Sequence, residues 1–433
     1  MSRTLSLPAR YGTLGVALAL GLTACATADA AGDASPSEHA DDHAHEEGEA
    51  QHGASEASAQ TPRLVMTYDG GIVVVDANSL ELEADLELEG FNRINPLGDG
   101  RHVAVSTAGG FQVLDAGTWS SAHGDHAHYF TGPASLTELM VAAEQPGHVV
   151  VHDGLTTLFD DGTGDVSVFH ADDWAHMVEE GHLDTIRTYT TAAAHHGVAV
   201  TTDEGNLMVT LGDEEGRTGA MLLDSEDQVL TENAQCPGVH GETAFADAEG
   251  DHLVMVGCDD GVLILHGDHF HKIDSGLDYA RTGNLYSVDG SSIVAGDRKT
   301  DPDAGIGLHE IVLIDTDAET MSVVDPFGGA EAQYTWRDVR RGDDGQVLVL
   351  GTDGTLRVLD ETGAVTAEIP VVDAWDIPEE WQTAHPAVEV LAGMAYVTEP
   401  ATGEVHIVDY VGGEIWKSVE VGVQMNEIVG VTG

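Results

Sequence analysis

The stretch Leu64-Val-Met-Thr-Tyr-Asp-Gly-Gly-Ile-Val-Val-Val-Asp76 decides the fold of this chain, because its pattern recurs along the sequence. Two runs rich in β-branched residues flank a turn of Asp and Gly, and such runs bounded by turn residues indicate a β-hairpin. Seven further copies follow, the sixth with an internal insertion, at residues 103–115, 140–153, 198–210, 253–265, 293–315, 347–360 and 395–409.

The copies are about 47 residues apart on average, which is typical of the four-stranded blades of a β-propeller. No long segment has helical periodicity. We therefore predict an all-β fold over residues 62–433, an eight-bladed propeller with seven blades as the alternative. The last predicted strand, near residues 425–431, has no hairpin after it, so pairing it with the first hairpin would close the ring and remove an exposed edge.

The N-terminus is typical of an exported protein. Arg3 and Arg10 precede a short apolar run that ends in Leu22-Thr-Ala-Cys25, a pattern that predicts a secretory signal over residues 1–24 rather than a membrane span. The last four residues resemble a bacterial lipobox. We expect Cys25 to carry a lipid and to hold the protein at the outer side of the cell membrane or in the periplasm. The alternative is an ordinary signal peptide with a chance cysteine.

Residues 25–61 form an acidic segment that contains almost nothing large and apolar. Such a segment buries no core, so we expect a disordered linker. Its histidines alternate with carboxylates, which favours an arm that captures metal ions, although a simple solvated spacer is the alternative. The arm histidines are His39, His43, His45 and His52.

The formal net charge of −60 excludes a nucleic-acid binder, whose contact surface is basic. Attraction to an anionic lipid surface is excluded for the same reason, so we expect membrane contact only through the lipid anchor. The acidity either concentrates cations near a monomeric protein or serves a salt-adapted, soluble surface. Beyond Cys25, the two cysteines Cys236 and Cys258 are expected to form a disulfide, with a zinc thiolate site as the alternative.

Two hexapeptides carry the strongest chemical signal: His123-Gly-Asp-His-Ala-His128 and His266-Gly-Asp-His-Phe-His271. Imidazole and carboxylate are ligands that suit zinc, and residues two apart in a strand face the same side. His128, His240 and His385 also lie at similar offsets before their hairpins, which favours positions facing the central channel. The predicted principal metal site therefore consists of His123, Asp125, His126, His128, His240 and His385. In the alternative interpretation, His240 and His385 are polar residues that line the channel and hold water.

The second hexapeptide directly follows a predicted third strand, so it is expected near the opposite face or the outer rim. We interpret it as an auxiliary metal site made of His266, Asp268, His269 and His271, or else as an exposed polar turn. The pair His195-His196 reads as a turn between strands and is expected to be superficial or structural.

Taken together, these features resemble the AztD-type periplasmic zinc metallochaperones. The matching features are Glu38-His-Ala-Asp-Asp-His-Ala-His45, the propeller repeat, the first hexapeptide and Cys236-Pro-Gly-Val-His-Gly241. The resemblance implies Zn²⁺ binding and direct transfer to the solute-binding protein of a zinc ABC importer.

The predicted function is thus zinc capture and transfer without catalysis. The alternatives are a propeller used as a protein-interaction scaffold and a metal-dependent hydrolase or lyase. Neither a Ser-His-Asp nucleophile elbow nor a zincin helix motif is found in the sequence. Because imidazole also suits copper and nickel, the residues alone do not decide between zinc, copper and nickel as the bound metal.

Overall fold

The computed structural model describes residues 53–124, 126–213 and 215–433. The predicted signal segment, Cys25, the four arm histidines and Asp125 lie outside the described residues. Neither the boundary at residue 24 nor lipidation is therefore addressed by the fold.

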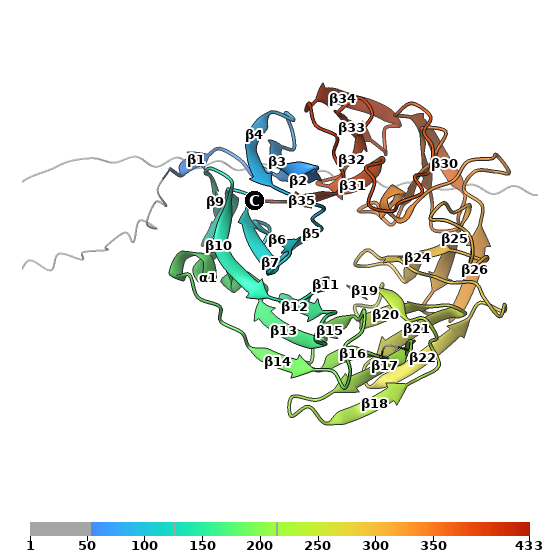
Figure 1. Ribbon diagram of the computed structural model, residues 1–433. Coiled ribbons are helices and arrows are strands. Elements are labelled where there is room, and N and C mark those ends of the chain that lie inside the picture. The colour runs from blue at the N-terminus through green and yellow to red at the C-terminus, as the bar shows by residue number, and fades with distance from the viewer. Residues whose placement is uncertain (1–52, 125, 214) are drawn as a thin grey trace, which may run out of the picture. The chain divides into compact units, whose positions relative to one another are not determined.

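Within the described residues, eight four-stranded antiparallel sheets follow one another around a ring (Figure 1). Eight blades, rather than seven, make up the propeller. From the inner to the outer strand, the first four blades are β35 (Ile428–Val431), β2 (Arg63–Tyr68), β3 (Gly70–Asp76) and β4 (Leu82–Leu88); β5 (Ile94–Pro96), β6 (His102–Thr107), β7 (Gly110–Asp115) and β10 (Ser135–Ala142); β11 (Pro146–His152), β12 (Leu155–Asp160), β13 (Asp165–His170) and β14 (Arg187–Thr190); and β15 (Ala199–Thr201), β16 (Leu207–Gly212), β17 (Arg217–Leu223) and β18 (Val229–Asn233).

The remaining blades follow in chain order. They are β19 (His240–Ala246), β20 (His252–Cys258), β21 (Gly261–His266) and β22 (His269–Asp274); β23 (Leu285–Tyr286), β24 (Ile293–Arg298), β25 (Glu310–Asp315) and β26 (Thr320–Val324); β27 (Val339–Arg341), β28 (Val347–Leu350), β29 (Thr355–Leu359) and β30 (Val365–Pro370); and β31 (Ala387–Leu391), β32 (Met394–Glu399), β33 (Glu404–Asp409) and β34 (Glu414–Glu420).

The ring closes as the sequence predicts. β35, the last strand of the chain, pairs antiparallel with β2, and Val431 lies opposite Arg63. The first blade thus combines both ends of the propeller, and β2 is paired on both sides, with β35 and with β3.

Six of the eight predicted hairpins are the middle strands of their blades, and two are not. Residues 140–153 span the end of β10 and all of β11, so this segment is a crossover between two blades. Residues 198–210 contain β15 and β16, which are the first and second strands of their blade. The cause is that a short crossover between two β-rich runs has the same local pattern as a hairpin.

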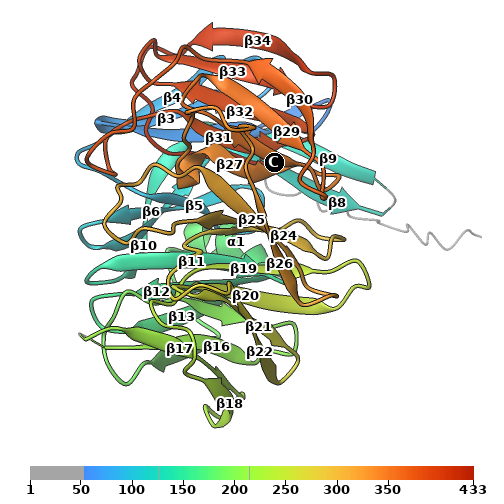
Figure 2. The same ribbon diagram turned by 90° about the vertical axis from the view of Figure 1, so that its right-hand side faces the viewer.

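An insertion that carries the first hexapeptide explains part of this misassignment of hairpins. Strands β8 (Thr118–His123) and β9 (His126–Thr131) form a hairpin inserted between the third and fourth strands of the second blade. This hairpin projects beyond the blades in Figure 2. It pairs with β1 (Ser55–Ala57), whose residues were assigned to the linker. Ordered structure therefore begins before residue 62, because the inserted hairpin offers a free edge to the incoming chain.

The hydrophobic core lies between neighbouring blades. One cluster joins Val200 and Leu222 of the fourth blade to Val256 and Leu263 of the fifth. Both faces of a blade are covered, so strands such as β3 and β32 are buried along almost their whole length. This arrangement is why the middle strands read as continuous Val, Ile and Leu runs rather than as an alternating pattern.

Helices are few in the described residues: α1 (Trp174–Glu180) and two short 3₁₀ segments, Ala171–Asp173 and Trp336–Asp338. Trp174 and Met177 of α1 are buried against Phe169 and residues of the second blade. None of these helices is long and apolar enough to cross a membrane.

Candidate metal centre

Three histidines from three consecutive blades meet beside the central channel. His148 lies on β11, His240 begins β19, and His196 lies in the segment that leads into β15. Their ring centroids are 5.0–5.5 Å apart, and one ligand atom of each lies within 4.8 Å of the others. We call these three residues the channel cluster.

The spacing of the channel cluster fits one tetrahedral ion. Zinc binds imidazole nitrogen at about 2.0–2.1 Å, so two nitrogens on one tetrahedral ion lie about 3.3 Å apart. Nε2 of His196 is 3.0 Å from Nε2 of His240. A shift of a few tenths of an ångström therefore brings these two nitrogens to the separation that zinc requires.

Each ring of the channel cluster is held through its other nitrogen. Nδ1 of His148 is 3.0 Å from a carboxylate oxygen of Glu242, and Nδ1 of His196 is 2.5 Å from one of Asp161. Nδ1 of His240 donates to the carbonyl oxygen of Gly283 at 2.7 Å. Such partners fix Nδ1–H and leave the Nε2 lone pair for a metal, which is the usual environment of zinc-bound histidine.

The electrostatic environments of His148 and His240 differ. Burial, together with the neighbouring rings of His148 and His196, lowers the pKa of His240 well below its usual value, so this ring stays neutral. Burial also acts to lower the pKa of His148, but the charge and hydrogen bond of Glu242 outweigh it, and the net shift is upward. His240 is therefore ready to bind a metal at neutral pH, whereas His148 is the ring at which protons compete.

Local backbone structure explains how His240 reaches its position. Gly241 has φ +66°, and a Cβ there would lie 2.2 Å from the carbonyl oxygen of Gly283, the acceptor for His240. Cys236 and Cys258 form the expected disulfide with their Cα atoms 4.9 Å apart, within the usual range. The disulfide ties the segment before His240 to the end of β20.

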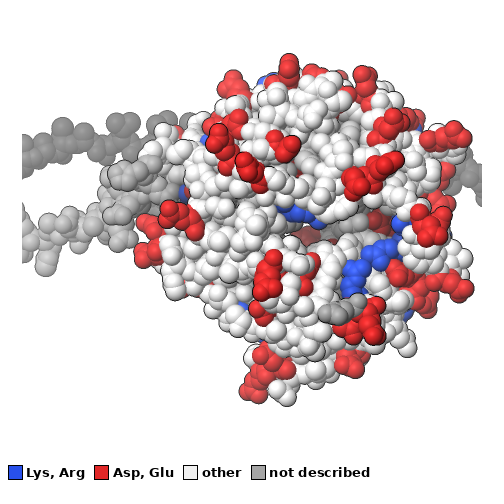
Figure 3. All heavy atoms as spheres, viewed as in Figure 1, with Lys and Arg blue, Asp and Glu red and all other residues white. Residues whose placement is uncertain are grey.

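The channel cluster is accessible from solvent. The side chain of His196 is 46% exposed, and that of His148 is 20% exposed. Acidic side chains are spread over the face of the molecule seen in Figure 3, where the few basic ones gather near the hollow in its middle. A surface of this kind attracts cations.

A second group lies on the inserted hairpin, which we call the hairpin cluster: His123, His126 and His128. Its ring centroids are 5.0–5.7 Å apart. Nδ1 of His128 is 2.8 Å from a carboxylate oxygen of Glu56. Glu56 lies on β1, which pairs with β9. The group is largely exposed, and His123 lies directly opposite His126 across the hairpin.

The structure does not bring the described residues of the first hexapeptide, His240 and His385 together. His123, His126 and His128 lie on an insertion between the third and fourth strands of one blade, not on a crossover into an inner strand. His385 lies elsewhere: its Nδ1 donates to Thr383 O at 2.7 Å, its Nε2 is 3.1 Å from Thr335 Oγ1, and its ring stacks on Trp375. Both nitrogens of His385 are thus occupied by protein partners.

The second hexapeptide lies at the turn between β21 and β22, away from the channel cluster. His266 is 3.7 Å from Asp251, His271 is 3.5 Å from Glu319, and His269 contacts its neighbour Asp268. Among the described residues these side chains do not form a group of three ligand atoms. Of the four residues of the predicted auxiliary site, the structure thus pairs Asp268 with His269, whereas His266 and His271 contact acidic residues of other segments.

Sequence reasoning missed two of the three residues of the channel cluster. His148 lay inside a segment read as a hairpin, and His196 was assigned to a superficial turn. The available signal was that His148, His196 and His240 all lie just before or near the start of an inner strand in consecutive blades. This pattern becomes visible once the crossover at residues 140–153 is recognised.

The fold and site together define a class: an eight-bladed propeller with a channel-side group of three histidines and a separate exposed group. Comparisons with known proteins agree with this description. The chain is 23% identical over 332 residues to the zinc chaperone AztD of Citrobacter koseri, which covers 76% of this chain and 75% of that protein. No family model matches the chain.

Solved structures show the same fold. The crystal structure of Citrobacter koseri AztD matches with a TM-score of 0.73 and 21% identity, covering 87% of this chain and 99% of that one. The apo structure of that protein matches with a TM-score of 0.71 and 20% identity, covering 86% and 98%. Dihydro-heme d1 dehydrogenase NirN shares only the general fold, at a TM-score of 0.53, 11% identity and coverage of 85% and 74%.

These matches confirm the resemblance to AztD-type proteins that the sequence indicates. The similarity extends over most of the propeller rather than over the histidine motifs alone. AztD is described as a chaperone and not as an enzyme, in agreement with the non-catalytic class expected for this chain.

Proposed function

We propose that this protein is an extracytoplasmic zinc chaperone whose channel cluster binds one Zn²⁺ ion and releases it to a partner protein. The observation that carries the proposal is the common arrangement of His148, His196 and His240: Nδ1 of each is held by an oxygen acceptor, and the Nε2 side is left for a metal. The resemblance to the zinc chaperone AztD supports zinc as the metal.

Three protein ligands leave one tetrahedral position for water or for a ligand from another molecule. Transfer between proteins needs such a position, because the incoming ligand must bind before the last histidine leaves. The exposure of His196 makes it the ring that an acceptor reaches first. The receiving protein we propose is the solute-binding protein of a zinc ABC importer.

The hairpin cluster is proposed as a second zinc site. It offers three imidazoles, with Glu56 oriented towards His128. Because it is more exposed than the channel cluster, we expect weaker binding and faster exchange there. The arm histidines His39, His43, His45 and His52 are proposed to capture ions, and Cys25 is proposed to anchor the chain to the membrane surface.

The deciding experiment is a competition titration of Zn²⁺ against a chromophoric chelator at neutral pH. The variant with His148, His196 and His240 changed to Ala should lose the tightest equivalent of zinc. The matched control is His170→Ala, which removes an exposed histidine at the end of β13 and should bind as the parent does. Unchanged tight binding by the triple variant would refute the assignment.

Transfer is tested separately. The zinc-loaded protein is mixed with the apo solute-binding protein in the presence of a chelator that traps free ions. Zinc should appear in the acceptor faster than it appears in the chelator. Equal partition at the rate of free dissociation would rule out direct transfer.

A further inference from the structure

A third group of metal-ligating side chains lies in the eighth blade, away from both histidine clusters. Glu399 ends β32, Glu404 begins β33, and His406 lies two residues further along the same strand. One ligand atom of each lies within 4.8 Å of the others. We call these residues the blade-8 cluster, and neither the sequence motifs nor the proposed function involves them.

The two carboxylates of this cluster oppose each other. Glu399 and Glu404 are directly paired across the β32–β33 hairpin, and Glu420 is the register partner of Glu404 on β34. Like charges placed directly opposite each other destabilise a sheet unless a cation compensates them. Glu399 is only 7% exposed, so water screens this repulsion poorly.

Within the described part of the chain, Nε2 of His406 lies 3.4 Å from a carboxylate oxygen of Glu399. That nitrogen is buried and makes no hydrogen bond. The other ring nitrogen, Nδ1, is 2.7 Å from Ser418 Oγ. When Nδ1 donates to Ser418, the lone pair on Nε2 faces the carboxylates, an arrangement that a positive ion between them stabilises.

We propose that Glu399, Glu404 and His406 bind a divalent metal ion. Two carboxylate oxygens and one imidazole nitrogen suit zinc, manganese or ferrous iron, and they form a harder donor set than three imidazoles. The contact of Ser418 with Nδ1 is the kind of outer partner that orients a metal-binding histidine. The proposal stands independently of the channel cluster.

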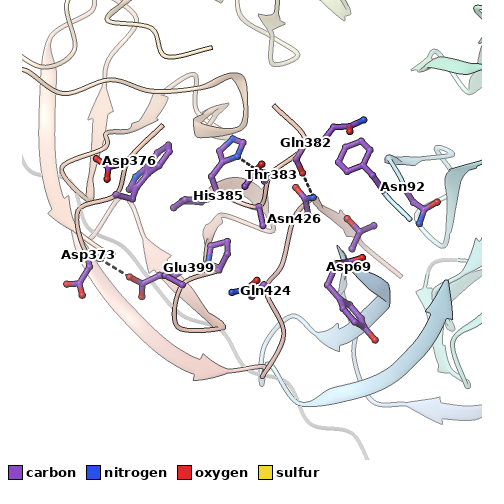
Figure 4. A pocket seen from close by; sticks show the side chains of 18 of the residues that line it. Asp69, Asn92, Asp373, Asp376, Gln382, Thr383, His385, Glu399, Gln424 and Asn426 are labelled. Atoms are coloured by element: carbon purple, nitrogen blue, oxygen red, sulfur yellow. Dashed lines mark hydrogen bonds between the residues drawn. The ribbon is translucent and has the colours of Figure 1, made fainter. Parts of the chain in front are cut away.

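The site has a path to solvent. Glu399 lines a cavity of about 610 Å³ together with residues of the segments between β30 and β31 and between β34 and β35 (Figure 4). The Glu399 carboxylate is fixed there by the backbone N–H of Asp373 at 2.9 Å and by Thr402 Oγ1 at 3.0 Å. An ion bound by the cluster would therefore stiffen the β32–β33 turn and the wall of this cavity.

The cavity opens among the connections between successive blades. His196 lies in another connection of this type, between β14 and β15. Connections of this kind lie at one end of a propeller. The cavity beside Glu399 and the exposed side of the channel cluster at His196 therefore open on the same face. The blade-8 cluster is thus placed to hold a further ion on the face that a zinc acceptor would approach.

The test removes the other candidate histidine sites. In the full-length chain, the channel cluster, the hairpin cluster, the three histidines of the second hexapeptide and the four arm histidines are changed to Ala, and this background is titrated with Zn²⁺ and Co²⁺. We expect about one equivalent of either ion to remain bound, and we expect His406→Gln or Glu404→Gln in this background to weaken binding about 10–100-fold. The controls Glu414→Gln and His170→Gln change exposed residues and should bind as the background does.

Folding of each variant is checked by circular dichroism and thermal unfolding, and metal should raise Tm in the background but not in the His406 variant. Crystals of the unmutated protein grown with Zn²⁺ supply a measurement that needs no variant: anomalous density should lie within bonding distance of His406 Nε2. Absence of residual binding in a folded background, or crystals grown with Zn²⁺ that hold no metal beside His406 Nε2, would overturn the proposal.

Discussion

Nε2 of His196 lies 3.0 Å from Nε2 of His240, although the two residues are 44 positions apart in the chain and the whole fourth blade lies between them. Each ring is fixed from behind by a different acceptor, Asp161 for His196 and Gly283 for His240. Two imidazoles this close repel each other when both are charged. Burial and the neighbouring rings of His148 and His196 lower the pKa of His240 and keep it neutral. The proposed zinc site thus places a neutral His240 beside His196.

Glu242→Gln should weaken zinc binding at neutral pH by about 10–100-fold without unfolding the protein. The carboxylate of Glu242 orients His148 and strengthens it as a donor through the 3.0 Å contact with Nδ1. Isothermal titration calorimetry on the purified variant measures the change. Glu414→Gln, at an exposed position on β34, is the control; a variant that binds zinc as tightly as the parent would show that Glu242 is not a supporting residue.

Zinc affinity should fall as the pH decreases, and the fall should begin at a higher pH in the parent than in Glu242→Gln. Burial acts to lower the pKa of His148, but Glu242 raises it above the usual value, so protons occupy Nε2 of His148 earlier than they occupy an ordinary histidine. Removing the carboxylate takes away the upward shift and moves proton competition to lower pH. Apparent Kd values measured across the range around the usual histidine pKa test this ordering, and identical pH profiles for the two proteins would contradict it.

The propeller should lose stability between about pH 6.5 and pH 4 because of His385. Burial, and then the charge of Arg337, lowers the pKa of His385 to about 4 in the folded protein. The unfolded chain takes up a proton near pH 6.5, whereas the native chain does not, so the free energy of unfolding falls as the pH drops through this window. The full effect is about 3 kcal/mol.

Urea unfolding of the parent and of His385→Gln at several pH values isolates this contribution. The variant should show a shallower loss over the same window, although it is less stable at neutral pH. His170→Gln should follow the parent, because His170 is exposed. Parallel curves for the parent and His385→Gln would mean that His385 titrates normally.

Replacing Cys236 and Cys258 together with Ala should lower the free energy of unfolding by about 2–5 kcal/mol. The disulfide closes a loop between residues 22 apart in sequence and holds the backbone that precedes His240. Zinc affinity should fall as well, because His240 begins the strand that follows this loop. Thermal unfolding and a zinc titration of the double variant, compared with the parent treated with reductant, measure both effects; full zinc affinity in the folded double variant would separate the disulfide from the site.

The sequence by itself determined the propeller. Strands buried on both faces must be rich in Val, Ile and Leu, and turns that contain Gly, often with Asp, recur between them, so residues 64–76 and their copies reveal the repeat without any three-dimensional information. The sequence also predicted the pairing of Cys236 with Cys258, since its one further cysteine is Cys25, and the closure of the ring by β35, since a terminal strand without a partner leaves an exposed edge.

Only the tertiary structure decided which histidines meet. A motif such as residues 123–128 brings ligands together through local geometry, and its three histidines do lie close to one another on their hairpin. His148, His196 and His240 share no motif and are brought together because three consecutive inner strands converge on one channel. Contacts of this kind depend on the register of each blade, and a single misread crossover at residues 140–153 was enough to hide His148 and to place His128 in the wrong part of the molecule.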